Sequence, residues 1–474
     1  MTIDALICSI PHCGSPLMTL WMPANLKAVL TRAGFTATAM DLNSEVMANV
    51  DKDTMNKQLL IDFFYHQKFN NNDIDIINTT IAQVVNRITR SEAKNVFLYL
   101  EDYGGQIMAR WVCAGIRQTM PNSRIILMGN GIKKELGTSD LGLMDTLKNL
   151  NLLDDYILGD IEDAIVSYMK GELHKNINGE DWEQPPDLNS LPIPNFNDID
   201  LSIYPTPTLP IVDVRGCIKS CEFCNIVEHW STFQYRTADK IFAEMMHHVD
   251  KYDVRDFEFI TKVVNGNLKE FKKLASLMAE YNSKRIKKDQ LSWSGHFIIR
   301  DPKSHPETLW EDISKSNASL LLGVEGLNEK IRMSMQHRSF TNADLDYHLD
   351  MGKKYNIPMS IRLTMAYPTE TLDDYNKARI WFRDRQRYAN SPLHTVELLL
   401  MGIHAGTKLQ KKSDQLNLKT TKYPSIWINQ ILNITPANRR DLILDLKKIC
   451  EEEWGINAVT NSQELWSIDN IELK

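Results

Sequence analysis

Three cysteines that lie close together are the residues of this sequence best suited to chemistry. Cys217, Cys221 and Cys224 occur within the segment Arg215–Cys224, with three residues between the first two and two between the last two. Thiolates are soft ligands that bind iron–sulfur clusters and zinc. Three ligands on a four-iron cluster would leave one iron open to chelate a small molecule, as an open position distinguishes catalytic from structural metal sites.

The spacing is compatible with two other kinds of site. His229 follows Cys224 and could complete a structural zinc site of three cysteines and one histidine. A cluster used only for electron transfer would take its fourth ligand from elsewhere in the chain. We interpret the other four cysteines as small buried hydrophobic side chains: Cys8, Cys13, Cys113 and Cys450. Spacing alone therefore indicates a metal site without identifying the metal.

The composition is that of an ordinary globular protein. The 474 residues indicate two or three domains, and 43% are hydrophobic and 24% charged. A net charge of −7 gives no reason to expect nucleic-acid binding through bulk charge. An odd number of cysteines, seven, argues against a disulfide framework. No stretch is apolar enough for a membrane span or a signal peptide, so we expect a cytoplasmic protein without membrane contact.

Residues 1–170 alternate predicted strands with predicted helices, which favours a flavodoxin-like, doubly wound parallel sheet. In such sheets ligands bind outside the carboxyl ends of the strands. Glycines at 104–105 and 129–131 fall at two of these ends, where they permit either a tight turn or a close ligand. We expect strands at 5–9, 36–40, 95–100, 124–128 and 155–158, and helices at 20–33, within 57–90, around 107–120 and from 162.

Residues 171–210 are polar and rich in proline, which indicates an extended linker packed across a surface. A second series of strands and helices covers 211–410. It contains about six units, fewer than the eight of a closed barrel, and predicts a partial TIM-like (β/α)6 barrel. Residues 411–474 are predicted to be mainly helical. The strands expected in the second series are 211–214, 257–260, 291–299, 320–323, 359–365 and 396–401.

With Phe223 directly before the last cysteine, the loop resembles the signature of radical S-adenosylmethionine (radical SAM) enzymes. The subgroup that it resembles carries an N-terminal cobalamin (vitamin B12)-binding-type domain. Further segments resemble motifs of that subgroup and follow one another in the same order, which makes chance agreement a poor explanation. These segments are Asp155–Glu162, Asp187–Pro194, Arg236–Glu244, Gly323–Asn328, Met335–Thr341, Tyr367–Thr371 and Ala405–Leu409.

The resemblance implies a 4Fe-4S cluster on the three cysteines, with S-adenosylmethionine chelated by the open iron. One electron would then cleave S-adenosylmethionine to methionine and a 5′-deoxyadenosyl radical, which abstracts hydrogen from the substrate. Phe223 would lie against the adenine, and Glu325 would face the methionine or ribose part, although a helix cap or ion pair is an equal reading for Glu325. Arg338 and Arg362 are candidates for carboxylate contact, with surface ion pairs as the alternative.

The same resemblance suggests residues that could contact cobalamin in the N-terminal domain: Tyr103, Gly104, Gly105, Gly129, Asn130, Gly131 and Gly159. The chain lacks the Asp-x-His-x-x-Gly motif that supplies a histidine to cobalt in some cobalamin proteins. It also has Thr261 and Lys262 where the subgroup often carries acidic residues. No residue therefore indicates cobalt binding directly.

The function implied by the resemblance is cobalamin-dependent methylation of an unactivated carbon. A radical rearrangement, epimerisation or cyclisation without cobalamin is the alternative within the same class, and a zinc-stabilised binding protein is the alternative outside it. An electron donor such as flavodoxin or ferredoxin would be a partner. The sequence does not identify the substrate, which could be a small molecule or a peptide, the oligomeric state, or catalytic residues beyond the cluster ligands.

Overall fold

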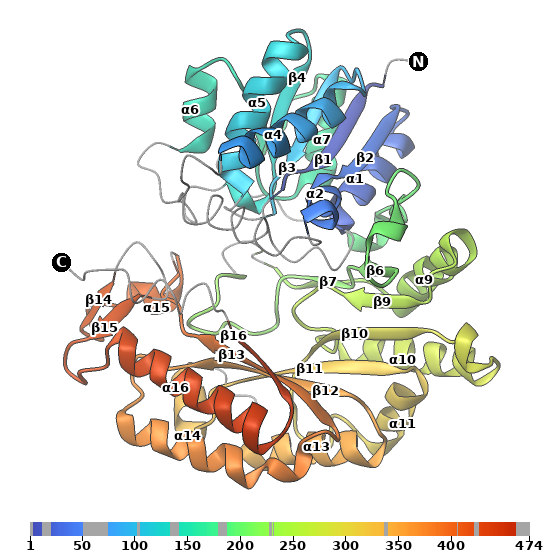
Figure 1. Cartoon of the computed structure of the whole chain (residues 1–474). Helices are drawn as coiled ribbons and strands as arrows, with labels where there is room; N and C mark the ends of the chain where they lie inside the picture. Colours follow the sequence, from blue (N-terminus) through green and yellow to red (C-terminus); the bar gives the residue numbers. More distant parts are fainter. Residues whose placement is uncertain are drawn as a thin grey trace. The chain divides into compact units, whose positions relative to one another are not determined.

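The computed structural model describes residues 3–11, 20–50, 74–101, 105–132, 142–178, 187–226, 230, 232–335, 340–404, 406–420 and 426–460. Contacts divide the chain into two compact units, Met1–Pro210 and Ile211–Lys474. Each unit is built on one parallel sheet covered by helices (Figure 1). Five of the residues singled out in the sequence lie outside the described residues: Cys13, Tyr103, Gly104, His229 and Arg338.

The first unit contains a parallel sheet of five strands in the order β2-β1-β3-β4-β5. This order is the flavodoxin-like one, so the predicted fold of the N-terminal domain is confirmed. Its strands are β1 (Ala5–Ser9), β2 (Ala37–Asp41), β3 (Asn95–Tyr99), β4 (Arg124–Met128) and β5 (Asp155–Ile157). Its helices are α1 (Trp21–Arg32), α2 (Leu42–Val50), α4 (Ile74–Thr89), α5 (Gly105–Thr119), α6 (Leu143–Asn149) and α7 (Ile161–Lys170).

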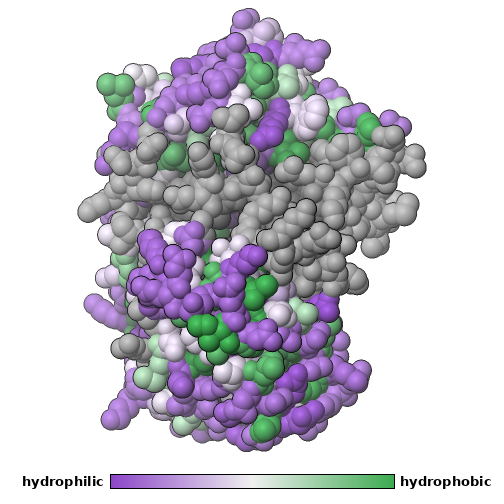
Figure 2. All heavy atoms as spheres, turned by 90° about the vertical axis from the view of Figure 1, so that its left-hand side faces the viewer, coloured by the Kyte–Doolittle hydropathy of each residue, from purple (hydrophilic) through white to green (hydrophobic). Residues whose placement is uncertain are grey.

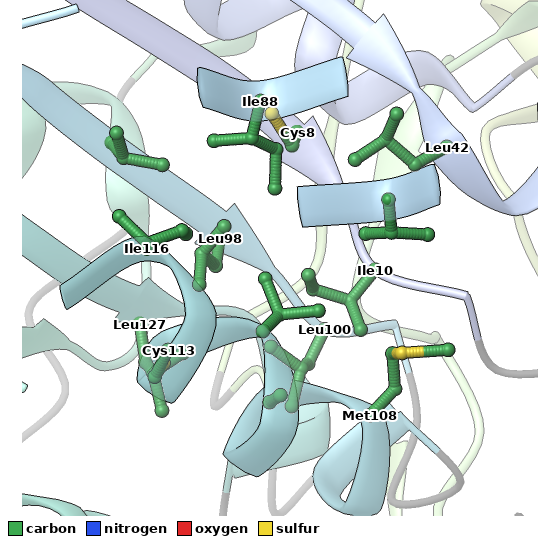
Figure 3. Packing of buried hydrophobic residues seen from close by; sticks show 14 of the residues in the cluster. Cys8, Ile10, Leu42, Ile88, Leu98, Leu100, Met108, Cys113, Ile116 and Leu127 are labelled. Carbon is green, nitrogen blue, oxygen red and sulfur yellow. The ribbon is translucent and has the colours of Figure 1, made fainter. Parts of the chain in front are cut away.

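Helices cover both faces of this sheet because its strands are apolar on both sides. On β1, Ala5 and Ile7 pack against α1 and α7, whereas Leu6 and Cys8 pack against α4 and α5. Figure 3 shows part of the second cluster, in which Cys113 and Ile116 of α5 lie close to strand residues such as Leu98 and Leu127. Cys8, Cys113 and Cys450 are fully buried, as predicted for structural cysteines.

Residues 187–204 are fastened to the first unit by polar side chains. Lys27 Nζ lies 2.5 Å from Asp198 Oδ2, which also accepts a hydrogen bond of 3.1 Å from the backbone of Ala39. The Tyr204 hydroxyl donates to Asp41 Oδ2 at 2.7 Å. Asp198 and Tyr204 are therefore anchors of this segment, which contains the one-turn helices at Leu188–Ser190 and Leu201–Ile203.

The second unit contains a parallel sheet of seven strands in the order β16-β13-β12-β11-β10-β9-β6. The sheet is open, since its end strands β16 and β6 have only one neighbour each, and this matches the predicted partial barrel. Its strands are β6 (Thr208–Ile211), β9 (Asp256–Phe259), β10 (Ser292–Phe297), β11 (Ala318–Glu325), β12 (Met359–Met365), β13 (Leu393–Leu400) and β16 (Asn457–Thr460).

Helices follow the strands of this sheet and cover one of its faces (Figure 1). The helices α13, α14 and α16 each begin with a capping box, at Thr341, Thr371 and Thr435, which satisfies backbone donors at the helix start. The longer helices are α9 (Ala238–Tyr252), α10 (Leu268–Ser283), α11 (Glu307–Lys315), α13 (Asn342–Lys354), α14 (Leu372–Asp384) and α16 (Pro436–Lys448), and the short ones are α12 (Glu329–Ser334) and α15 (Lys408–Lys411).

The described part of residues 411–474, which was predicted to be mainly helical, contains short strands as well as helices. Besides α16, the described part contains the antiparallel pair β14 (Leu418–Thr420) and β15 (Trp427–Asn429), and β16 pairs in parallel with β13. These strands contain three or four residues each, too few for a period of two to be recognised. For β16, pairing with the distant strand β13, which the local sequence does not encode, determines the structure.

One prediction concerns a histidine in the core of the second unit. His348 of α13 lies against Trp310 and Phe297, and its Nδ1 donates to the Asp344 carbonyl at 2.8 Å. Burial lowers the pKa of His348 to about 4. Between that pH and about 6.5 the unfolded chain binds a proton that the folded chain does not, so stability falls as pH falls.

We expect His348→Gln to lose less stability than the wild type between pH 7 and pH 5, by about 2 kcal/mol. Denaturant unfolding of both proteins at the two pH values measures this difference. His394→Gln is the matched control, because His394 is an exposed histidine of the same unit. Equal pH dependence in His348→Gln and the wild type would show that His348 does not titrate in this way.

Among the described residues, no helix has the length and apolar character needed to cross a membrane. Figure 2 shows one face on which hydrophilic residues predominate and hydrophobic ones form small groups. Such a distribution is usual for a surface in contact with water.

Candidate metal and cofactor centre

The cysteine loop follows β6 and is enclosed by a short hairpin. Strand β7 (Val214–Arg215) pairs in antiparallel fashion with β8 (Gln234–Tyr235), so the loop leaves and returns at the same place. Arg236 holds this base: its backbone N–H donates to Asp213 O at 2.7 Å, and its Nη1 donates to Val212 O at 3.0 Å. Its Nη2 also pairs with the buried Glu244 of α9 at 2.6 Å. The Arg236–Glu244 segment thus fixes the start of the loop.

Gly216, directly before Cys217, is required by the geometry of the hairpin. Its φ angle is +75°, and a Cβ atom added there would lie 2.4 Å from the backbone oxygen of Thr232. Other residues adopt positive φ only at a cost of about 1–2 kcal/mol. The positive φ therefore disfavours a side chain at this position, and the close approach of the backbone at Thr232 leaves no space for one.

We expect Gly216→Ala to destabilise the loop by more than the cost of the positive φ alone, because the backbone at Thr232 must also move. Gly455→Ala is the matched control, since Gly455 has a φ of +66° and open space around its Cα. That control should cost about 1–2 kcal/mol. The measurement is the free energy of unfolding of the second unit, together with the iron retained after reconstitution. Equal losses for the two variants would contradict this explanation.

The three cysteines lie in a partly buried environment. Cys221 is 8% exposed, whereas Cys217 and Cys224 are half-buried. Burial raises the pKa of all three thiols, and to about 12 for Cys221, where the negative charges of Cys224 and Glu325 add to the effect. Free thiolates would repel one another here, and a cationic metal centre would offset this repulsion. This donor set therefore suits the binding of a cluster.

Within the described residues, no three His, Cys, Asp or Glu side chains converge on a position for one metal ion. A four-iron cluster makes a different demand, since each thiolate would bind a separate iron atom. The donor set therefore remains compatible with the cluster predicted from the sequence. The zinc alternative depends on His229, which lies outside the described residues.

Polar side chains occupy the face of the barrel sheet that is turned away from the helices. Burial alternates along β11 and β12, with the fully buried residues packed toward the helices. The other face carries Glu325, Arg362 and Thr364 near the carboxyl ends of these strands. Glu397 of β13 and His296 of β10 lie on the same face. A period of two thus gathers ionisable groups from four strands at one place.

Two groups of contacts organise this polar face. Arg362 Nε lies 2.5 Å from Glu397 Oε2, and its Nη1 donates to His296 Nε2 at 3.2 Å. The Thr364 hydroxyl donates to Glu325 Oε2 at 2.5 Å. Arg362, predicted as a carboxylate contact, is therefore ion-paired inside the barrel and bridges β10 and β13.

Glu325 has an unusual backbone for a residue with a side chain. Its φ angle is +62°, and the register between β11 and β12 shifts between Gly323 and Glu325. Strain of this kind persists only where the surrounding structure enforces it, and it is common at functional sites. The bend turns the Glu325 side chain back along its strand, so that an atom added at Gly323 would lie 3.4 Å from Glu325 Oε1.

Burial and neighbouring charges shift the pKa values of two groups on this face. Burial raises the pKa of Glu325, and Glu397 adds to the effect. Burial and the nearby cations Arg362 and Lys262 lower the pKa of His296 to about 3, so His296 is neutral and accepts from Arg362. The face therefore holds cations as well as carboxylates, and Glu325, which accepts from a neutral hydroxyl, is the carboxylate suited to a sulfonium or ammonium group.

Phe223 packs into an apolar cluster near the cysteine loop. Its neighbours there include Met401 and Ile403, which follow β13, and Trp427 of β15. Trp427 also donates from Nε1 to the Met401 carbonyl at 2.9 Å. The structure thus places the aromatic ring of this loop residue in apolar surroundings, and its expected contact with adenine stays a prediction.

The glycines of the first unit occur where strands end. Gly129 has a φ of +103°, and a Cβ there would lie 2.4 Å from the Leu100 oxygen. The backbone N–H of Gly131 donates to the same oxygen at 3.0 Å. Close contact between the ends of β3 and β4 is therefore enough to explain Gly129. Of the remaining candidates, Gly105 begins α5, Asn130 lies in the one-turn helix Asn130–Ile132, and Gly159 lies between β5 and α7.

The structure also identifies polar residues that the sequence analysis did not select. Asp213 is buried, accepts a hydrogen bond from the Thr261 hydroxyl, and has its pKa raised to about 7 by burial. Thr261 and Lys262 follow β9, where the subgroup that the sequence resembles often carries acidic residues. Asp213, which contacts Thr261, supplies a carboxylate at this place instead. Glu397 and His296 were also missed, and only their alternation with apolar residues on β13 and β10 could have indicated them.

Comparison with known proteins extends this result. No protein-family model and no curated protein matches the chain. Solved structures that match over most of its length include radical S-adenosylmethionine enzymes that were solved with cobalamin, and the chain has their fold. The recognised fold and its predicted architecture are thereby confirmed.

Two of these structures are of the methyltransferase TsrM from Kitasatospora setae. The one with cobalamin and a 4Fe-4S cluster has a TM-score of 0.63 and 11% identity, and the match covers 99% of this chain and 91% of TsrM. The one with tryptophan and an S-adenosylmethionine analogue has a TM-score of 0.62, 12% identity, and coverage of 99% and 90%. OxsB with aqua-cobalamin and S-adenosylmethionine has a TM-score of 0.61, 14% identity, and coverage of 87% and 55%.

Proposed function

We propose that this protein is a radical SAM enzyme whose cluster is held by Cys217, Cys221 and Cys224. The observation that carries the proposal is the position of these cysteines on the loop that follows the first strand of a partial barrel. A 4Fe-4S cluster bound there supplies, when reduced, the electron that cleaves S-adenosylmethionine to methionine and a 5′-deoxyadenosyl radical. An electron donor such as flavodoxin or ferredoxin is the corresponding partner.

The chain's own residues would bind and orient S-adenosylmethionine. Glu325, a carboxylate near the carboxyl end of β11 that accepts from the neutral Thr364 hydroxyl, suits the ammonium or sulfonium group. Arg362, held between Glu397 and His296, is available to a carboxylate only if the ligand competes with Glu397. Phe223 and the apolar residues after β13 would exclude water from the reacting groups.

At the finer level, we propose that the reaction is cobalamin-dependent methylation of an unactivated carbon. The flavodoxin-like sheet of the first unit and the likeness to TsrM and OxsB, which were solved with cobalamin, support this proposal. Cobalamin in the first unit would supply the methyl group that the activated carbon receives. The turns at Gly105, Gly129–Gly131 and Gly159 are the proposed contacts, at the carboxyl ends of the strands.

Anaerobic purification and reconstitution with iron and sulfide test the first level. The expected result is a brown protein that releases 5′-deoxyadenosine from S-adenosylmethionine after reduction. A colourless protein that retains zinc in place of iron would overturn it.

Reconstitution with hydroxocobalamin followed by gel filtration tests the second level. Stoichiometric cobalamin in the protein peak is expected. Cobalamin that separates completely from a protein still able to cleave S-adenosylmethionine would point instead to a radical rearrangement, epimerisation or cyclisation.

A further inference from the structure

Glu222, which lies inside the cysteine loop between Cys221 and Phe223, has an unexpected environment. It is 3% exposed, whereas Ile218 of the same loop is 38% exposed. Burying a carboxylate beside three thiols adds negative charge where thiolates would already repel one another. Such a residue persists only if the surrounding structure compensates its charge and satisfies its oxygens.

Both carboxylate oxygens of Glu222 have partners. The Tyr367 hydroxyl, beyond the end of β12, donates to Oε2 at 2.8 Å. Lys412, directly after α15, forms an ion pair with Oε1. The lysine side chain is 42% exposed, so it joins a buried carboxylate to the surface of the unit.

The backbone of Glu222 is bound as well. Its N–H donates to the Met335 carbonyl at 3.1 Å, and its carbonyl accepts from the Leu409 N–H at 2.8 Å. Met335 follows β11 and α12, whereas Leu409 lies in α15, after β13. Through four contacts, one residue thus joins the loop to segments that follow three successive strands.

Three of these partners lie in sequence motifs to which the proposed function assigns no role. Met335, Tyr367 and Leu409 lie in the segments Met335–Thr341, Tyr367–Thr371 and Ala405–Leu409, each of which resembles a subgroup motif. They are far apart in sequence and converge on Glu222. Because Glu222 is buried and its charge is compensated, it would hold the loop in place and so fix the direction of the neighbouring thiols.

We propose that Glu222 is a positioning residue for the cluster, and that its ion pair with Lys412 couples the cluster loop to the segment after β13. This inference rests on the proposed function, because it assigns Glu222 a role toward the cluster. Lys412 and Tyr367 offset the negative charge of Glu222, which would otherwise act on the cluster and disfavour its reduction. Residues that orient metal ligands in this way typically affect metal affinity or activity by about 10- to 100-fold.

The test compares Glu222→Gln, Lys412→Met and the wild type after reconstitution. Both variants should retain iron within about twofold and yield 5′-deoxyadenosine at least about tenfold more slowly. The electron paramagnetic resonance spectrum of the reduced cluster should respond more weakly to S-adenosylmethionine in Glu222→Gln. In Lys412→Met the midpoint potential should be more negative, because the carboxylate loses its cation. Neither the weaker spectroscopic response nor the shift in midpoint potential is expected from a merely structural role.

Lys419→Met is the matched control, since Lys419 is an exposed lysine of β14 close in sequence to Lys412. It should behave like the wild type in all four measurements. Wild-type spectra, potentials and rates in both Glu222→Gln and Lys412→Met would overturn this inference alone. A wild-type protein without iron would overturn the proposed function and the inference together. Lys412→Met keeps the test decisive if Glu222→Gln fails to fold, because Lys412 is partly exposed.

Discussion

Replacing any one of Cys217, Cys221 or Cys224 by alanine should abolish S-adenosylmethionine cleavage. A four-iron cluster with two protein ligands loses both its anchorage and the geometry that keeps a single iron open. We expect less than half of the wild-type iron and a rate of 5′-deoxyadenosine release lower by at least about a thousandfold, since the reaction has no other source of the electron. Iron analysis, the visible absorption spectrum and chromatography of the products measure the effect.

Cys8→Ala provides the control for this series. Cys8 is fully buried in the first unit, so its removal tests the general cost of deleting a buried sulfur. We expect this variant to lose some stability and to keep its cluster and its activity. Full iron content and activity in Cys221→Ala would rule out Cys221 as a ligand. Loss of zinc instead of iron in the three loop variants would favour the zinc-stabilised binding protein.

The fold could be predicted to a large extent because its pattern is local. The strands of both sheets alternate with amphipathic helices along the sequence, which is the pattern of parallel sheets. β16 was missed because four residues carry no recognisable period and its pairing with β13 is decided by distant contacts. Thus long elements were visible in the sequence, whereas short edge strands were not.

The candidate site was predictable only where its residues lie close together in the sequence. The cysteines lie in one loop, so their spacing is a direct signal. His296, Arg362 and Glu397 come from three strands, and their contacts depend on the register of β10 to β13, which no local pattern states. The environment of Glu222 could not be predicted either, because its burial depends on contacts with Tyr367 and Lys412, which are distant in sequence.

The glycines show a further limit of motif reading. Gly129 was selected because it follows a strand in a sheet that often binds ligands, yet its contact with Leu100 already requires a glycine. Gly216 lies in the loop directly before Cys217, and the structure gives it a specific steric reason. A glycine in a motif therefore indicates that another group lies close to its Cα. Only the structure shows whether that group is backbone or a ligand.

Glu325→Gln should lower the rate of S-adenosylmethionine cleavage by about 10- to 100-fold, the effect of losing a hydrogen bond to a charged group. The amide has nearly the shape of the carboxylate and can still accept from the Thr364 hydroxyl, so the strained turn should persist. What is lost is the negative charge that would face the ammonium or sulfonium group. The variant should therefore bind its cluster normally, and kcat/KM for S-adenosylmethionine should fall.

The pH dependence distinguishes this charge effect from a change of shape. Because burial raises the pKa of Glu325, the carboxylate becomes protonated on acidification earlier than an exposed glutamate, and wild-type cleavage should decline in that range. Glu325→Gln should lack this decline. Glu258→Gln is the matched control, since burial also raises the pKa of Glu258, which lies level with Ser294, before the carboxyl ends of the strands. Equal kcat/KM for Glu325→Gln and the wild type would mean that the bent end of β11 has a structural role and that the Glu325 charge does not act on S-adenosylmethionine.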